Sequence, residues 1–553
     1  MPLSRREWLS TSALPLLQTS RSLKPPNVLV VITDDQGYGD LSLHGNPHLR
    51  TPNLDAIALA GAQFTQFQVC PVCSPTRSSL LTGRYNYRTG VVDTYLGRSM
   101  MYPDEVTMAE YLAGAGYRTG NFGKWHLGDN YPLRAIDQGF HEAVVCKGGG
   151  IAQPSDPPGN TYFDPILQRN GVEKKYSGYC TDIFFNEAID FIARHRSQPW
   201  FCYLAVNAPH DPLQIADNFV KPFQDRGLDE ATAKTYGMVA NIDANAGRLL
   251  AKLREMDLER DTILIFLTDN GPQRDRYNAG MRGRKGTVYQ GGIRVPFFIR
   301  YPRLIQAGTK IDRTAAHIDV LPTILELCGV ARPGSSRPRF DGRSLAPLLR
   351  GETGAWADRT LFTQWHRGDE PELFRDCAAR TQGYKLINGK ELYDLTADPA
   401  EKNNIAAQLP EVAARLRLET EAWFKDVSST RGYAPPRIHV GAPQEPVTVL
   451  TRQDWRGPKA TWEATGLGHW ELQVTRQARY EIRLRMPALT AAAQATLRVG
   501  PLTLLSSAAP GATEVRFAGV ALPVGPTRLE GALTAGDRQW GAHYVEVTRT
   551  GLA

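Results

Sequence analysis

Short apolar runs separated by helical patterns constrain the fold of this 553-residue chain more than any other feature. The runs, at residues 28–32, 200–206, 262–267 and 295–299, consist mostly of strand-forming apolar side chains. A strand without polar alternation is buried on both faces of its sheet. Helix-like stretches at 181–194 and 238–256 lie between these runs. This alternation predicts an α/β fold with a mostly parallel central sheet and helices on both faces.

The pattern changes twice after residue 355, which indicates two further parts. Residues 356–431 contain two or three short strand patterns and a final helix at 411–425, and they predict a small α+β subdomain. A linker with proline and glycine follows. Residues 447–553 then show strand patterns separated by Gly, Pro and Ala, without a helical pattern. We therefore expect an α/β domain at 25–355, the subdomain, and a C-terminal β-sandwich or jelly roll.

The N-terminus resembles a twin-arginine export signal. Ser4-Arg5-Arg6-Glu7-Trp8-Leu9 is followed by a short, mildly apolar run up to Leu17. The run is brief and no clear Ala-x-Ala cleavage site follows, so a disordered basic tail is the alternative. We assign residues 1–24 to the signal and expect an exported protein, either periplasmic or extracellular, with the cleavage site left open.

Charge and cysteine usage exclude several classes of protein. The net charge of +7 is small for this length and no basic run concentrates it, so no nucleic-acid partner is expected. No stretch of about 18 apolar residues occurs, so no membrane span is expected. Seven scattered cysteines form no disulfide framework. Cys70 and Cys73 make one Cys-x-x-Cys pair, but no second pair completes a zinc site.

Oxygen-bearing side chains directly follow two of the predicted strands. Asp34 and Asp35 follow the first run, and Asp269 and Asn270 follow the third. In open α/β sheets, ligands bind at the carboxyl ends of the strands. Carboxylate and amide oxygens suit Ca²⁺ or Mg²⁺ better than zinc, and three crowded carboxylates would repel one another without a cation. A simple turn after the strand is the alternative for Asp34-Asp35.

Basic side chains follow two other predicted strands. Lys124 and His126 follow a strand pattern at 117–121, and His210 follows the run at 200–206. Lys285 stands in a glycine-bearing loop. Together they offer positive charge and proton transfer, which a transferring sulfate or phosphate needs. Taken singly, the histidines would be packing or capping residues and Lys285 a solvated loop charge.

The segment Cys73-Ser74-Pro75-Thr76-Arg77 opens a further helical pattern. Proline suits the first turn of a helix, and the N–H groups of that turn can bind an anion. Arg77 would lie one turn along, on the same side as Cys73. The segment therefore suits a reactive group held against a negatively charged ligand, with a buried free cysteine as the alternative.

This segment, continued by Leu81-Thr82-Gly83-Arg84, resembles the modification signature of the type I sulfatases, which belong to the alkaline phosphatase superfamily. Thr76 stands where serine is commonest in that signature. Residues 123–128, Gly-Lys-Trp-His-Leu-Gly, resemble the second sulfatase signature. Further landmarks of the family, in its order, are Thr51-Pro52-Asn53-Leu54-Asp55, Asn207-Ala208-Pro209-His210, Thr268-Asp269-Asn270-Gly271, and Gly283-Arg284-Lys285-Gly286 with Gly291-Gly292. The similarity covers roughly residues 26–405.

The resemblance implies an arylsulfatase-like sulfuric ester hydrolase that uses a formylglycine made from Cys73 by a formylglycine-generating enzyme. It implies a divalent cation, Ca²⁺ or alternatively Mg²⁺, held by Asp34, Asp35, Asp269, Asn270 and residue 73. Arg77 and Lys124 would steady the hydrated aldehyde, while His126, His210 and Lys285 would contact the sulfate. One hydroxyl of the hydrate attacks sulfur as Asp269 takes its proton and Lys285 or His210 protonates the leaving oxygen. The second hydroxyl expels sulfate, with His126 as base.

Two alternative functions remain open. A phosphate or phosphonate ester hydrolase of the same superfamily is the nearer one, although no second metal-ligand set is evident. A non-enzymatic glycan-binding protein is the other, because Trp455, Trp462, Trp470 and Trp540 could stack on sugars rather than pack in a core. Specificity would lie in loops such as 85–101 and 129–160. We expect a carbohydrate sulfate, with its identity, exo or endo action and the oligomeric state open.

Overall fold

The computed structural model describes residues 24–331, 338–352, 354 and 356–552. The predicted export signal therefore lies almost wholly outside the described residues. Within the described ranges, no helix combines the length and the apolar character needed to cross a bilayer.

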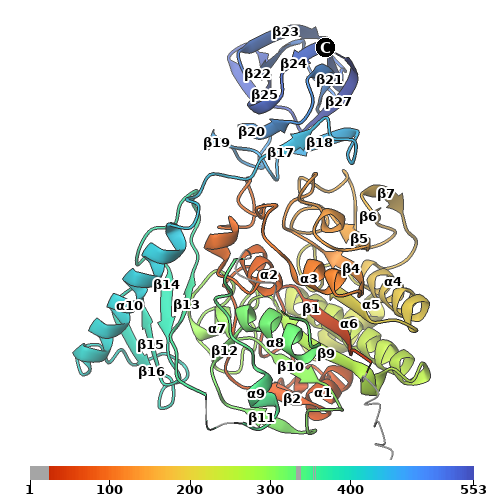
Figure 1. Cartoon of the computed structure of the whole chain (residues 1–553). Helices are drawn as coiled ribbons and strands as arrows, with labels where there is room; N and C mark the ends of the chain where they lie inside the picture. The colour runs from red at the N-terminus through yellow and green to blue at the C-terminus, as the bar shows by residue number, and fades with distance from the viewer. Residues whose placement is uncertain (1–23, 332–337, 353, 355, 553) are drawn as a thin grey trace, which may run out of the picture.

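A ten-stranded sheet forms the centre of the molecule (Figure 1). Its strands, in spatial order, are β11 (Thr309–Ile311), β2 (Ala62–Phe64), β10 (Phe297–Arg300), β9 (Thr262–Thr268), β1 (Asn27–Thr33), β8 (Trp200–Ala205), β4 (Arg118–Lys124), β5 (Glu142–Cys146), β6 (Ile166–Arg169) and β7 (Val172–Lys175). The five strands β9, β1, β8, β4 and β5 are mutually parallel. β10 pairs antiparallel with β9, and β6 and β7 extend the other side antiparallel. The predicted, mostly parallel α/β sheet is confirmed.

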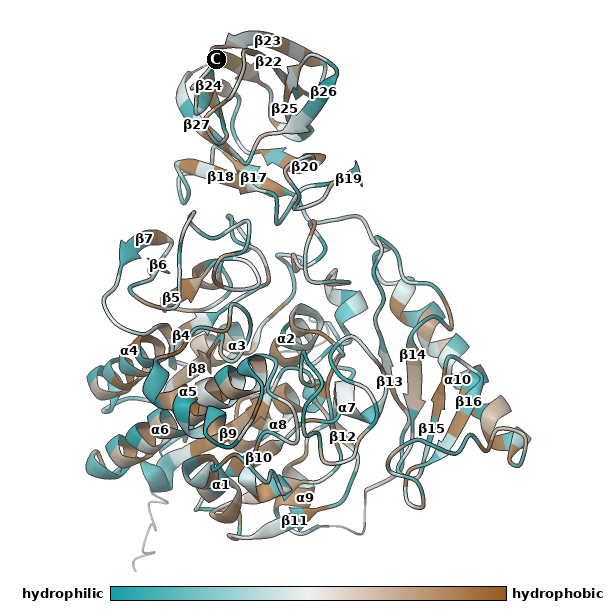
Figure 2. Cartoon of the chain, turned by 180° about the vertical axis from the view of Figure 1, so that it is seen from behind, coloured by the Kyte–Doolittle hydropathy of each residue, from teal (hydrophilic) through white to brown (hydrophobic). Residues whose placement is uncertain are grey.

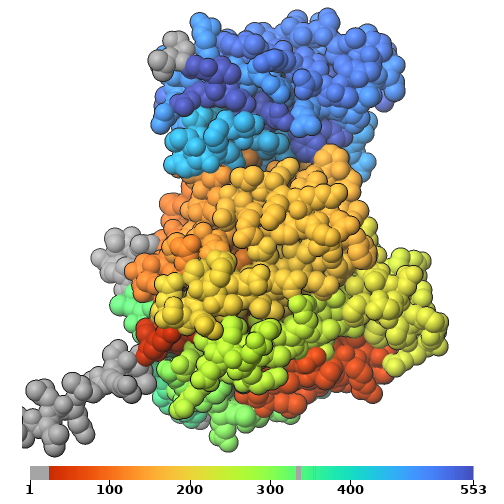
Figure 3. Space-filling view, turned by 90° about the vertical axis from the view of Figure 1, so that its right-hand side faces the viewer, coloured from red at the N-terminus to blue at the C-terminus, as the bar shows by residue number. Residues whose placement is uncertain are grey.

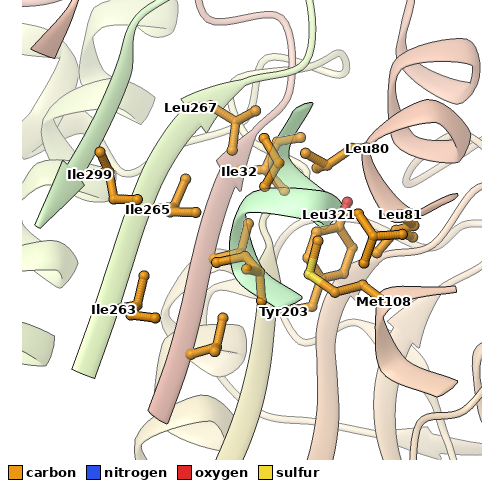
Figure 4. Packing of buried hydrophobic residues seen from close by; sticks show 14 of the residues in the cluster. Ile32, Leu80, Leu81, Met108, Tyr203, Ile263, Ile265, Leu267, Ile299 and Leu321 are labelled. Carbon is orange, nitrogen blue, oxygen red and sulfur yellow. The ribbon is translucent and has the colours of Figure 1, made fainter. Parts of the chain in front are cut away.

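Both faces of the sheet are covered, because alternate residues of each central strand pack in opposite directions. Val28, Val30 and Ile32 of β1 belong to one apolar core, and Leu29 and Val31 to the other. Helices α2 (Cys73–Thr82), α3 (Met108–Gly114) and α8 (Val320–Leu327) pack on the first face (Figure 4). Helices α1 (Pro52–Leu59), α4 (Cys180–His195) and α6 (Glu230–Glu255) pack on the second, and α4 and α6 carry both hydrophobic and hydrophilic residues (Figure 2).

Helix α6 begins eight residues before the helix expected at 238–256. Asp229 caps it, because its carboxylate accepts a hydrogen bond from the backbone N–H of Thr232 at 3.0 Å. The first two turns carry few apolar residues, so the apolar periodicity does not show where the helix starts.

The segment after the central sheet contains a four-stranded antiparallel sheet, whereas the sequence predicted two or three strands there. Its strands are β13 (Leu361–Gln364), β14 (Cys377–Arg380), β15 (Tyr384–Ile387) and β16 (Glu391–Asp394). Helix α10 (Pro410–Ser428) covers it through Leu416, which packs against Leu386 and Leu392.

The C-terminal segment folds as two facing sheets without a helix among its described residues. One sheet contains β17 (Ile438–Val440), β20 (Leu467–Val474), β25 (Gly525–Ala535), β22 (Ala493–Val499) and β23 (Leu502–Ala508), with β19 (Arg456–Lys459) and β26 (Arg538–Gly541) at its side. The other contains β18 (Val447–Thr451), β27 (Tyr544–Leu552), β21 (Ala478–Arg485) and β24 (Glu514–Leu522). β17 lies in the segment expected to be a linker, because it pairs with β20.

The sandwich packs directly on the α/β part (Figure 3). Its apolar core contains the fully buried Trp455 and Trp470. Leu96, Met100 and Leu133 of the α/β part belong to that same core. The two parts therefore share buried apolar surface.

Candidate active site

The carboxyl ends of the parallel strands gather the predicted site residues at one edge of the sheet. Asp34 and Asp35 directly follow β1, and Asp269 directly follows β9. Because β1 and β9 are parallel and in register up to Thr33 and Thr268, these carboxylates lie side by side. The backbone N–H of Asp35 donates to Asp269 Oδ1 at 3.2 Å, which ties the two strand ends together.

An acidic cluster at this edge has the donor set of a hard divalent cation. One ligand atom each from Asp34, Cys73 and Asp269 lies within 4.8 Å of the other two, as does one each from Asp34, Asp35 and His210. Asp34 Oδ1 and the amide oxygen of Asn270 are buried without a hydrogen-bond partner in the described part of the chain. Unpaired buried oxygens are costly, and a bound cation would satisfy them. The residues therefore fit a Ca²⁺ or Mg²⁺ ion.

Three basic side chains, of which Arg77 and Lys124 are fully buried, compensate the carboxylates. Lys124 Nζ lies 2.6 Å from Asp34 Oδ2, and Lys285 Nζ lies 2.6 Å from Asp35 Oδ1. The Nε and one terminal nitrogen of Arg77 donate to Asp269 Oδ2 at 3.1 and 2.8 Å. Arg77 also donates to the Lys124 carbonyl oxygen at 3.2 Å. Each carboxylate thus has one fixed basic partner.

The protonation of the carboxylates follows from this pairing. Burial disfavours the charged form of Asp35, but Lys285, His210 and Lys124 outweigh it and hold its pKa below the ordinary value. Burial and the neighbouring Asp34 raise the pKa of Asp269 to about 7, against Arg77. A bound divalent cation would lower this pKa, because its positive charge favours the carboxylate form of Asp269.

Cys73 is the first residue of the buried helix α2 and lines a cavity of about 490 Å³. Burial raises the pKa of its thiol, against Lys124 and Lys285. His126, His210 and Lys285 line the same cavity, with Arg284 and Arg367 adding positive charge. The cavity therefore suits an anionic group placed against residue 73.

The two histidines are neutral, and their tautomers follow from their partners. His126 Nε2 lies 2.7 Å from the Thr94 carbonyl oxygen, which can only accept, so Nε2 carries the proton. His210 Nδ1 lies 2.7 Å from the Asp211 carbonyl oxygen, and its Nε2 lies 3.8 Å from Asp35 Oδ2. Burial lowers the pKa of His210 to about 4 and that of His126 well below its usual range, with Lys124 adding to the effect at His126. His126 Nδ1 and His210 Nε2 are therefore the basic nitrogens.

Several residues of this site carried no readable signal in the sequence. Gln273 accepts from Lys285 Nζ at 3.2 Å and donates to Asp211 at 3.1 Å, so it holds the lysine beside Asp35. Gly149 lies against His126, and an added Cβ would come within 2.8 Å of its Cε1 atom. The run Gly148-Gly149-Gly150 was the one available sign of this close approach. Gln153 and Trp462 also line the cavity.

All ten predicted site residues lie in one connected cluster at this edge of the sheet. They are Asp34, Asp35, Cys73, Arg77, Lys124, His126, His210, Asp269, Asn270 and Lys285. Their individual roles in catalysis and metal binding stay predictions. Cys70 is the other half of the Cys-x-x-Cys pair. Its Sγ atom lies 3.3 Å from His317 Nε2 and forms no disulfide.

The family models and the similar proteins all point to the same family. The sulfatase family model matches residues 26–330, more than half of the chain, and the model for the C-terminal part of N-sulphoglucosamine sulphohydrolase matches residues 284–424. Human arylsulfatase A is 33% identical over 424 residues, which cover 68% of this chain and 78% of that protein. Human N-acetylgalactosamine-6-sulfatase is 33% identical over 374 residues, covering 63% of this chain and 69% of that protein.

A solved structure agrees with these relatives. Ps i-CgsB in complex with k-i-k-neocarrahexaose matches with a TM-score of 0.67 and 26% identity, covering 74% of this chain and 95% of that chain. The sandwich lies beyond the residues that the two family models match. On the family match, the relatives and the fold, this chain belongs to the sulfatase family and is a sulfuric ester hydrolase.

Proposed function

We propose that this protein hydrolyses carbohydrate sulfate esters, with residue 73 in its formylglycine form and one divalent cation, Ca²⁺ or alternatively Mg²⁺. The observation that carries the proposal is the place of Cys73, within 4.8 Å of carboxylate oxygens of Asp34 and Asp269 and at the wall of a basic cavity. Sulfated glycans are favoured because the structural neighbour Ps i-CgsB was solved with a neocarrahexaose.

The modified residue would supply a hydrated aldehyde, whose one hydroxyl attacks sulfur and whose other hydroxyl drives release of the sulfate. Asp34, Asp35, Asp269 and Asn270 would hold the cation through their oxygens. Arg77 fixes Asp269 and Lys124 fixes Asp34, so the oxygens keep their positions. Export through a twin-arginine signal and modification by a formylglycine-generating enzyme belong to the same proposal.

The remaining residues would handle the sulfate and the protons. Lys285 lies against Asp35 in the cavity wall, and it carries a positive charge that can neutralise the sulfuryl oxygens or protonate the leaving oxygen. His126 lines the cavity as a neutral imidazole, and its Nδ1 has no hydrogen-bond partner among the residues that the structure describes. This nitrogen can accept a proton, which suits the base of the release step. His210 would contact the sulfate beside Asp35, and Asp269 would take the proton of the attacking hydroxyl.

The test is turnover together with the chemical state of residue 73. Protein produced with a formylglycine-generating enzyme should hydrolyse p-nitrophenyl sulfate much faster than p-nitrophenyl phosphate. Cys73→Ala should lower kcat by at least about a thousandfold, because the nucleophile is removed. Mass spectrometry of the peptide that contains residue 73 should find the aldehyde or its hydrate.

The matched control is Cys328→Ala, because Cys328 is also buried but lies at the end of α8, outside the cavity. It should retain wild-type turnover. An active preparation in which residue 73 is an unmodified thiol contradicts the proposed nucleophile. Preferential hydrolysis of the phosphate ester contradicts the proposed substrate class.

A further inference from the structure

One wall of the active-site cavity comes from the C-terminal sandwich. Trp462, which follows β19, lines the cavity together with Cys73 and His126. Its ring packs edge-on against Tyr95, with 5.2 Å between the ring centroids. Trp455 and Trp470 are fully buried in the sandwich core, whereas Trp462 is only partly buried. Trp462 is therefore placed to contact a substrate.

The sandwich is fixed against the loop that shapes this cavity. Gln453 Nε2 donates to the Thr94 carbonyl oxygen at 2.9 Å, and the N–H of Gly97 donates to the Gln453 carbonyl oxygen at 2.9 Å. The same Thr94 oxygen accepts from His126. With the shared apolar core around Leu96, these bonds hold Trp462 at a defined position over the site.

A second and larger cavity begins where the first ends. It measures about 1050 Å³ and lies between the loop at residues 152–159 and the sandwich. Gln153 and Trp462 line both cavities, so the two meet at these side chains. A substrate bound at Cys73 can therefore extend past Trp462 into the cleft.

The lining of the cleft suits sugar hydroxyls. Arg483 and Arg485 of β21 and Glu546 of β27 line the cleft, and a guanidinium nitrogen of Arg485 lies 2.7 Å from a carboxylate oxygen of Glu546. Donors and acceptors therefore lie next to one another there. Glu514 and Asp156 add further carboxylates, which balance the basic side chains. Because side chains of both signs line the cleft, the hydroxyls of a sugar can donate to the carboxylates and accept from the guanidinium groups. Trp462 and Tyr544 offer ring faces.

We propose that the sandwich forms a second carbohydrate subsite, in which the sugar next to the sulfated one stacks on Trp462 and a further unit lies in the cleft beside Arg485. The inference rests on the proposed function, because the sulfated sugar must occupy the cavity at residue 73. It makes an oligosaccharide, rather than a free monosaccharide sulfate, the preferred substrate.

The experiment compares kcat/KM for a sulfated tetrasaccharide with that for p-nitrophenyl sulfate. Carrageenan, chondroitin sulfate and heparan sulfate tetrasaccharides serve as the panel, and the one turned over fastest is used. Trp462→Ala should lower the tetrasaccharide-to-aryl ratio about tenfold, mainly through KM, and Trp462→Phe should restore most of it. Arg485→Ala should lower the ratio about threefold to tenfold through lost hydrogen bonds.

Two control variants match these changes. Trp540→Ala removes a half-buried tryptophan of the sandwich that lines neither cavity. Arg498→Ala removes an arginine that pairs with Glu530. The Arg498 side chain is 52% exposed, which matches the 54% exposure of the Arg485 side chain. Neither control variant should change the ratio. Thermal unfolding of all variants reports whether the fold is intact.

The outcomes separate the two proposals. An unchanged ratio in Trp462→Ala or in Arg485→Ala overturns the subsite, as does a wild-type protein that prefers aryl sulfate over every tetrasaccharide. A wild-type protein with formylglycine at residue 73 but no turnover of any sulfate ester instead overturns the proposed function.

Discussion

At the scale of single residues, the site is held by buried charges that compensate one another. Arg77 and Asp269 are both completely buried, and so are Lys124 and Asp34. Loss of one partner would leave the other charge buried and uncompensated, which is costly. Lys285 differs because it is slightly exposed to the cavity, which lets it meet a substrate while it contacts Asp35.

Replacing Arg77 should therefore destabilise the protein strongly. Arg77→Met leaves the Asp269 carboxylate buried without its guanidinium and should lower the free energy of unfolding by about 3–5 kcal/mol. Denaturant titration in the presence of EDTA measures this, since no cation can then replace the lost charge. Arg274→Ala is the control, because its pair with Asp211 is 43% and 31% exposed and should cost less than about 1 kcal/mol. Equal losses in the two variants would contradict the compensation argument.

Removal of the proposed divalent cation should abolish activity and lower thermal stability together. EDTA-treated protein should regain turnover with Ca²⁺ or Mg²⁺, and the added ion should raise Tm because it binds only the folded state. In the Asp34→Asn variant the added ion should raise Tm much less than in the wild type. In the Asp225→Asn variant, which changes an exposed carboxylate, the ion should raise Tm as in the wild type. Differential scanning fluorimetry with and without the ion gives the result. Full activity after exhaustive chelation would refute the metal site.

At the scale of elements, the backbone between strand and helix aims the side chains. Asp35 and His126 have φ values of 64° and 60°, in the left-handed region that non-glycine residues seldom adopt. Both follow a central parallel strand, so the chain turns sharply at the edge where ligands bind. An added Cβ would lie 2.0 Å from Ser155 Oγ at Gly148 and 2.8 Å from His126 Cε1 at Gly149, so neither position has room for a side chain.

A methyl group at Gly149 should therefore reduce activity more than stability. An added Cβ would lie 2.5 Å from Gln153 Oε1 and 2.8 Å from His126 Cε1, so both side chains must shift. We expect Gly149→Ala to lower kcat/KM for p-nitrophenyl sulfate about tenfold or more. Gly383→Ala should leave kcat/KM unchanged, because no atom of the described residues lies within 4 Å of the added Cβ. Wild-type kinetics in Gly149→Ala would contradict this prediction, because the loop would then accommodate the methyl group without loss of activity.

At the scale of the whole molecule, we expect the sandwich and the α/β part to unfold as one cooperative body. Leu96, Met100 and Leu133 of the α/β part pack in the sandwich core, and Gln453 bonds to Thr94 across the junction. Separating the parts would expose this apolar surface and break these bonds. The active-site cavity itself depends on the junction through Trp462.

A core mutation in the sandwich should therefore destabilise the entire chain. Trp470→Ala removes a completely buried side chain and should cost about 3–5 kcal/mol. Calorimetry should show one transition shifted to lower temperature, with loss of aryl sulfate turnover in the same range. A separate low-temperature transition that leaves turnover intact would contradict a single cooperative body.

The fold follows from the sequence where burial is strongest. The central strands carry apolar runs because both of their faces are covered, so β1, β8 and β9 were predicted to within a residue or two. β23 and β25 were not predicted, because β23 is largely exposed and Gly525, Pro526 and Gly531 interrupt the pattern of β25. The start of α6 was missed because a polar cap at Asp229, not apolar periodicity, sets it.

The sequence by itself determined which residues gather at the ligand-binding edge, because parallel strands bring the residues after their carboxyl ends to one edge of a sheet. The resemblance to the sulfatases added Cys73 to that group. Asp34, Asp269 and His210 could thus be grouped before their distances were known. Only the tertiary structure decided what surrounds that cluster. Gln453 and Thr94 are 359 residues apart, and Trp462 reaches the cavity through the packing of two separate parts. No periodicity or local spacing encodes such a contact, because it arises from the shapes of surfaces that meet only after folding.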